Sequence, residues 1–234
     1  MRFILFLSIP FLFLSCAPTM RTISEMDPLG DGPEAIVDQE KQSISQTMDG
    51  VTITVSSYGW GRLRKVTRDI SINPFIYQGG LLRREAVQIA TVFHVLVENK
   101  REDKIEIHPS KAVILDGLGN QLGALTEETF RRLYPTTYRY VYDYDPFSPY
   151  PVFGYRMTYT EDFYKRLAAA RVLLKDETIF PGVRRAGLLA FEPVSREAKE
   201  ITLIIPDLVL YKDNEPLKRI DFKFRFKQRI RVLE

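Results

Sequence analysis

The stretch from Ile220 to Lys227 alternates strictly between apolar and charged residues, and it restricts the fold more than any other part of the chain. Successive side chains of a β-strand point to opposite faces, so this pattern predicts a strand with one face in a core and the other in water. The apolar positions are Ile220, Phe222, Phe224 and Phe226, and the charged positions are Asp221, Lys223, Arg225 and Lys227.

Shorter apolar patterns recur along the chain, and turn residues separate them. The longest, over residues 87–97, is apolar on both faces and predicts a central strand. About seven or eight such strands predict a mainly β fold, an antiparallel β-sandwich. The expected strands are 51–55, 87–97, 105–107, 112–115, 185–191, 201–205, 208–211 and 220–232.

Two helical segments interrupt the strands. Thr126, followed by two glutamates, predicts the start of a short helix that Pro135 ends. Thr160 predicts the start of a second helix, and residues of about 126–178 are therefore expected to be an insertion into the sandwich. The apolar stripe expected on the second helix is Phe163, Leu167, Ala170 and Leu174.

The N-terminus has the organisation of an export signal. Arg2 precedes an apolar run over residues 3–14, and the small residue Ser15 precedes the only cysteine, Cys16. The run is shorter than the roughly 20 residues that a membrane-spanning helix needs. Residues 1–15 are therefore predicted to be a signal peptide.

Leu14, Ser15 and Cys16 resemble a bacterial lipobox, in which the cysteine is fatty-acylated (for example with palmitate) after cleavage. Phe13 stands where such motifs usually have Leu, and an ordinary signal peptide is the alternative. The resemblance implies a lipid anchor at Cys16, and Ala17 after it is typical of lipoproteins of the outer membrane. The expected location is the periplasmic face of that membrane.

Residues 16–50 are predicted to form a flexible tether, because proline, glycine, serine and acidic residues are frequent there and no apolar period is sustained. Residues 51–234 are then the folded domain.

Three neighbouring blocks resemble a known family. They are Phe93–Lys100 with a V-x-N strand end, Ile105–Ser110 with Pro-Ser, and Val113–Gln121 with Leu115, Asp116 and Gly119. A later block runs from Pro181-Gly182 through Gly187 to Phe191-Glu192-Pro193. Together they resemble the immunoglobulin-like domain of unknown function of many bacterial lipoproteins and exported proteins. The resemblance covers about 87–125 and 179–226; it implies an immunoglobulin-like sandwich with a binding or assembly role, and it provides no catalytic residues.

Composition gives little support to catalysis. A single cysteine excludes internal disulfides and CxxC metal sites, and only two histidines, His94 and His108, are present. A net charge of +3 does not indicate nucleic-acid binding. There is no GxSxG or P-loop motif, and the acidic pair Asp143 and Asp145 is expected to be solvated. We therefore expect no enzyme activity, cofactor or metal.

The segment between Tyr134 and Tyr164 contains most of the chain's tyrosines. Tyrosine gives a large amphipathic contact area at low entropic cost, so this segment predicts either a partner surface or an aromatic cover over the end of the sandwich. The candidate contact residues are Trp60, Tyr138, Tyr140, Tyr142, Tyr144, Tyr150 and Tyr155.

Two functions are the main candidates. The first is a non-catalytic, membrane-anchored module that binds or assembles with another envelope protein. The second is a glycan or peptidoglycan binder that uses Trp60 and the tyrosines as stacking platforms. An envelope hydrolase is a third and weaker alternative, because its carboxylates cannot be assembled from the sequence.

Overall fold

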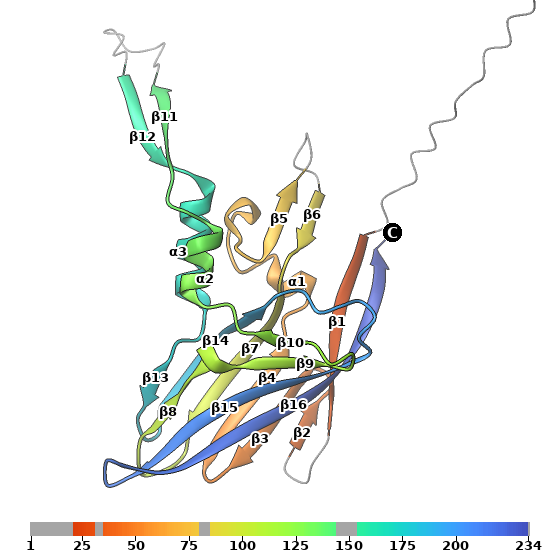
Figure 1. The fold of residues 1–234 in the computed structure, drawn as a ribbon, viewed down its shortest axis with the longest axis vertical. Coiled ribbons are helices and arrows are strands. Elements are labelled where there is room, and N and C mark those ends of the chain that lie inside the picture. The colour runs from red at the N-terminus through yellow and green to blue at the C-terminus, as the bar shows by residue number, and fades with distance from the viewer. Residues whose placement is uncertain (1–20, 31–34, 80–84, 144–153, 234) are drawn as a thin grey trace, which may run out of the picture.

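The protein is mainly β and antiparallel, and two sheets form a sandwich (Figure 1). The computed structural model describes residues 21–30, 35–79, 85–143 and 154–233. The predicted sandwich is thus confirmed.

The first sheet has the order β1-β16-β15-β8-β13, with β9 paired to β15 and β10 paired to β9. Its longest pairing joins β15 and β16, the strand that contains the alternating stretch 220–227. The strands are β1 (Arg21–Leu29), β8 (Ile105–Ile107), β9 (Val113–Asp116), β10 (Gln121–Gly123), β13 (Glu177–Ile179), β15 (Glu200–Lys212) and β16 (Glu215–Leu233).

The second sheet has the order β14-β7-β4-β3-β2, with β7 between β14 and β4 as the pattern of residues 87–97 predicts. Its strands are β2 (Ala35–Asp38), β3 (Ser43–Met48), β4 (Val51–Ser57), β7 (Thr91–Asn99) and β14 (Arg184–Phe191).

The main core lies between the two sheets. The four apolar side chains of the alternating stretch are buried in it, while the charged ones between them are exposed. Phe93 of β7 meets Phe226 of β16 across the core at a ring distance of 5.0 Å, and Phe191 of β14 at 6.3 Å. Aromatic pairs at these distances stabilise the core beyond their buried area.

The predicted tether over residues 16–50 is wrong for most of its length. Residues 21–29 form β1, and β2 and β3 belong to the second sheet. Met26 and Ile44 lie in the main core. Cys16 and the predicted signal peptide lie outside the described residues.

Polar contacts explain why these strands lack a clear apolar period. At the sheet edge, β1 is held to β16 by ion pairs of Asp27 with Arg229 and of Glu25 with Arg231 (3.2 Å). Between β3 and β4, hydroxyl pairs connect Ser45 with Thr54 (2.8 Å) and Thr47 with Thr52 (2.9 Å). Cross-strand hydroxyl and opposite-charge pairs stabilise a sheet as apolar pairs do.

The pattern over residues 87–97 is divided between two elements. β7 begins only at Thr91, and residues 85–88 form β6, which pairs with β5 (Ile76–Gly79) in a separate hairpin. The break lies at Ile89, whose N–H donates to the carbonyl of Phe75 at 3.0 Å. Val87, expected on the core face, is 52% exposed.

A second apolar cluster lies on the outer face of β7 and β14. It contains Val92 and Leu188 from the sheet, Phe75 beside β5, and Phe130 and Ala169 from the covering helices. The helical elements are α1 (Trp60–Leu63), η1 (Ile70–Ile72), η2 (Pro109–Lys111), α2 (Glu127–Leu133) and α3 (Glu161–Val172).

Both predicted helices form, and Thr126 caps α2 by accepting a hydrogen bond from the N–H of Thr129. The stripe predicted for α3 is partly wrong, because Ala169 is buried and Leu167 is 37% exposed. The helix is rotated so that its small residue contacts the cluster, which allows close approach.

The three blocks that carry the family resemblance contain residues that fix turns. Asn99 is buried; its amide donates to the carbonyls of Asp103 and Ile179 and its oxygen accepts from the N–H of Arg101. Asp116 accepts from the backbone N–H groups of Leu118 and Asn120. These roles are structural, and the immunoglobulin-like identity of the sandwich itself stays a prediction.

Candidate functional site

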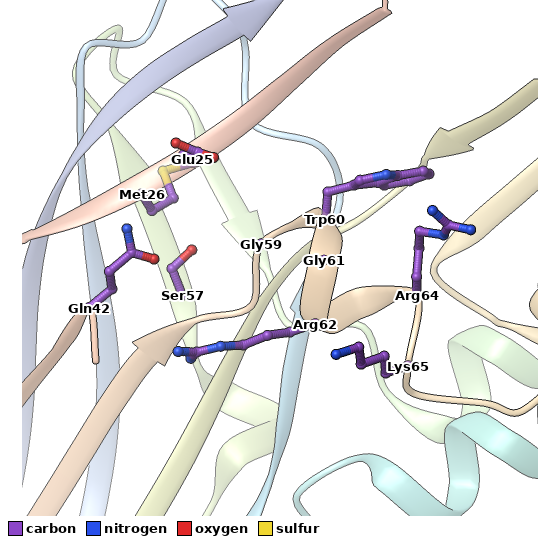
Figure 2. Close-up of a pocket in the computed structure, with 10 residues that line it drawn as sticks. All are labelled: Glu25, Met26, Gln42, Ser57, Gly59, Trp60, Gly61, Arg62, Arg64 and Lys65. Carbon is purple, nitrogen blue, oxygen red and sulfur yellow. The ribbon is translucent and has the colours of Figure 1, made fainter. Parts of the chain in front are cut away.

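A groove of about 680 Å³ lies between β1 and α1. Figure 2 shows its lining: Glu25 and Met26 come from β1, and Trp60 and Arg62 come from α1. The groove is also lined by Gln42, Ser57, Gly59, Gly61, Arg64 and Lys65. It is the concave site that contains the only tryptophan of the chain.

Local packing fixes the position of α1. Leu63 is fully buried in the second cluster, and the amide of the buried Asn73 donates to the Leu63 carbonyl at 2.8 Å. The same side chain accepts from the N–H of Phe75 at 3.0 Å, which connects α1 to the start of β5. Buried polar groups with satisfied hydrogen bonds specify a single arrangement, so α1 presents its remaining residues in a defined place.

Three exposed residues at the end of α1 and directly after it are basic. Arg62, Arg64 and Lys65 are exposed, and none of them forms an ion pair with another described residue. Arg62 donates to the carbonyl of Lys41 at 3.3 Å. In the view of Figure 2 its side chain extends toward Ser57 and Gln42, while the Trp60 indole leaves α1 on the side away from Glu25.

The positive charge affects a neighbouring group. Partial burial, with a smaller contribution from the Arg62 charge, lowers the pKa of His94 below its ordinary value. The imidazole stacks on Tyr58 at a ring distance of 6.3 Å, on the outer face of β7. A neutral, stacked His94 agrees with the expectation of a structural histidine in a sheet.

The predicted tyrosines belong to a different element. β11 (Tyr138–Asp143) and β12 (Gly154–Tyr159) form a two-stranded sheet, which we call the arm; it projects beyond α2 and α3 (Figure 1). Tyr138, Tyr140 and Tyr142 occupy alternate positions of β11, and Tyr155 is in β12 opposite Tyr142. Tyr144 and Tyr150 lie outside the described residues.

The base of the arm is closed by two threonines. The N–H of Thr160 donates to the carbonyl of Thr137 at 3.2 Å, and their hydroxyls are 2.6 Å apart. Above this base, the rings of Tyr159 and Phe163 stack at 3.9 Å and connect the arm to α3. Among the described residues, Trp60 therefore belongs to α1, whereas Tyr138, Tyr140, Tyr142 and Tyr155 belong to the arm, which is a separate element.

A smaller cavity of about 250 Å³ lies between the end of α3 and β14. Its walls include Leu173 and Leu188, and Ser110 and Asp176 stand at its edge. The Ser110 hydroxyl donates to Asp176 at 2.5 Å, and His108 Nδ1 is 4.0 Å from the same carboxylate.

Candidate metal ligands are not clustered in the part of the chain that the structure describes. No group of three or more His, Cys, Asp or Glu residues there could hold a metal ion. Glu127 and Glu128, the adjacent acidic residues at the start of α2, both form ion pairs with Arg131. Within the described ranges, no helix has the length and apolar character needed to cross a membrane.

The sequence analysis missed the basic residues around Trp60. A signal for them exists: residues 60–69 contain Arg62, Arg64, Lys65 and Arg68 with one acidic residue, Asp69. The net charge of the whole chain is close to neutral, so it does not reveal this local excess of cations.

Known proteins give no counterpart: no family model matches the chain, and neither a curated protein nor a solved structure matches it.

Proposed function

We propose that this protein is a non-catalytic envelope lipoprotein, anchored through acylated Cys16 at the periplasmic face of the outer membrane, whose arm binds another envelope protein. In this proposal the immunoglobulin-like sandwich is the rigid body that carries the arm. The leader and the lipobox-like residues support the anchor.

The observation that carries the binding role is the construction of the arm. β11 and β12 pair with each other, and neither pairs with a third strand in the described part of the molecule. A two-stranded hairpin alone is marginally stable in water, and unpaired strand edges are places where a partner's strand can add. Tyrosines at alternate positions add amphipathic contact area to such an element.

The first experiment asks whether the anchor exists. The protein is expressed with its own leader, purified from envelopes, and its N-terminal peptide is analysed by mass spectrometry. We expect a peptide that begins at acylated Cys16. An unmodified N-terminus would exclude the lipid anchor, and the binding role of the arm would then be judged by the second experiment.

The second experiment tests the arm. Proteins that co-purify from solubilised envelopes are compared between the wild type and a variant with Tyr138, Tyr140, Tyr142 and Tyr144 changed to Ala. Phe180→Ala is the matched control, because Phe180 is an aromatic residue that is 62% exposed between β13 and β14, outside the arm. We expect the fourfold variant to lose a partner that the control retains; the same partners in all three would contradict the proposal.

A second candidate function is glycan binding in the groove. The observation in its favour is that Trp60 lines a groove together with an amide, Gln42, and a carboxylate, Glu25. Aromatic faces with amides and carboxylates beside them are suited to sugars. Sedimentation with purified peptidoglycan tests it: binding that Trp60→Ala abolishes would support this function, and binding that the substitution leaves unchanged would exclude it.

A further inference from the structure

The position of β1 limits how far the folded body can lie from its proposed anchor. β1 begins at Arg21, five residues after Cys16. An extended chain covers at most about 3.5 Å per residue, so Arg21 would lie within roughly 18 Å of the acylated end. The body is therefore held against the membrane surface and not on a long tether.

The end of the body nearest that anchor carries two features. The start of β1, α1 and the β5–β6 hairpin all lie toward the same end of the molecule (Figure 1). Trp60 of α1 and Ala86 of β6 pack against the same apolar cluster, which holds these two elements together.

The first feature is positive charge. Arg62, Arg64 and Lys65 are exposed without an acidic partner among the described residues, and Glu25 on the opposite wall of the groove is already paired with Arg231 at 3.2 Å. Lys and Arg side chains near an anionic bilayer are each attracted to its headgroups.

The second feature is an exposed apolar pair. Tyr77 of β5 and Val87 of β6 are direct cross-strand partners, with 56% and 52% of their surfaces exposed. Exposed aromatic and aliphatic side chains at the same end of a molecule as exposed cations are typical of elements that lie in a membrane interface.

We infer that this end of the molecule, made by Arg62, Arg64 and Lys65 with Tyr77 and Val87, docks on the anionic headgroups of the membrane in which Cys16 is anchored. The inference rests on the proposed lipid anchor for its geometry. In this inference, phosphate-bearing lipid headgroups bind at the mouth of the groove. The contact also orients the body, so that the arm meets a partner that lies at the membrane surface.

The contact is testable without the anchor. Every described strand follows residue 20, so the chain from Cys16 onward, produced without acylation, retains the whole described fold. Its sedimentation is measured with vesicles of phosphatidylglycerol and phosphatidylethanolamine, and with vesicles of phosphatidylcholine alone. We expect binding to the anionic vesicles that salt weakens.

Substitutions assign the contact to these residues. Arg62, Arg64 and Lys65 changed together to Gln should lower partitioning by on the order of 100-fold, which corresponds to about 1 kcal/mol per cation. Lys212, Lys218 and Lys223, on strands β15 and β16, changed to Gln remove the same charge from residues outside the proposed contact and should have little effect. Equal losses for the two triple variants, or equal binding to both kinds of vesicle, would overturn the inference.

The anchored protein gives an independent readout, because Trp60 is the only tryptophan. Acylated protein in phosphatidylglycerol vesicles should show Trp60 fluorescence that iodide quenches less than in detergent, and the Gln triple variant should lose this protection. Protection by soluble peptidoglycan fragments with none from vesicles would overturn the inference and return the groove to the glycan function. If Cys16 is not acylated, the proposed anchor is wrong, but the sedimentation experiment with vesicles still decides whether this surface binds anionic headgroups.

Discussion

The sandwich and the arm are both antiparallel sheets, but they are stabilised in different ways. In the sandwich each sheet covers the other, and Phe93, Phe191 and Phe226 meet between them. The arm has one layer, closed at its base by Thr137 and Thr160. A sheet without a second layer gains little from burial, so the fold itself gives no reason for the arm, and this is why we propose that it binds a partner.

The largest expected effect is in the sandwich core. Phe226→Ala should lower the free energy of unfolding by about 3–5 kcal/mol, because it removes a fully buried ring that packs on Phe93. Urea unfolding measures it. Lys223→Ala, on the exposed face of the same strand, is the control. Equal losses for the two variants would mean that the core is not between these sheets.

The next effect tests the contact between strand β14 and the segment that follows α3. A Cβ at Gly187 of β14 would lie 2.7 Å from the backbone N and Cα of Leu174, just after α3. Gly187→Ala should therefore cost about 1–3 kcal/mol, as overpacking does. Gly123→Ala has open space around it and serves as the control. An unchanged urea midpoint for Gly187→Ala would contradict this close approach.

A smaller effect depends on pH. The pKa of His94 is lowered in the folded state, so the unfolded chain binds the extra proton first as pH falls through the ordinary value of 6.5. Stability should fall between pH 7.5 and 5.5, by at most about 1.4 kcal/mol per pH unit from this group. His94→Gln should flatten that slope in urea unfolding at several pH values. A slope equal to that of the wild type would exclude His94 as its source.

The smallest effect on stability should come from removing the arm. Because Thr160 N–H already bonds to the Thr137 carbonyl, Asn-Gly can replace residues 138–159 as a two-residue turn. The ring contact of Tyr159 with Phe163 is lost with the arm, while the sandwich core is untouched, so the free energy of unfolding should change by about 1 kcal/mol or less. A loss of stability comparable to that of Phe226→Ala would mean that the arm is part of the structural core. It would contradict the distinction between the arm and the sandwich.

The sequence predicted those parts of the fold in which burial repeats with a fixed period. The alternation of residues 220–227 located β16, and Thr126 located the start of α2. It failed for β1 and β3, because edge pairing, ion pairs and hydroxyl pairs hold these strands with few buried apolar side chains. The ion pairs join β1 to β16 from opposite ends of the chain, and the hydroxyl pairs join polar residues, so a search for apolar periods detects neither.

The candidate site was only partly accessible from the sequence. Trp60 does line a groove, as do basic residues that the sequence analysis missed. The role proposed for these basic residues depends on two features of the fold. Leu63 and Asn73 fix α1 at one end of the sandwich, and β1 starts at the same end. The tyrosines were recognised from their spacing, but only strand pairing placed Tyr138–Tyr142 on an element that stands apart from the body.

The central claim, that the arm and not the sandwich contacts a partner, is tested most directly by site-specific photo-crosslinking in intact cells. A photoreactive residue is placed at Tyr142 in the arm, and in a second protein at Ile36 of β2, which is 73% exposed on the body. We predict a discrete crosslinked envelope protein from position 142 and none from position 36. The same crosslinked species from position 36, with none from position 142, would contradict the account.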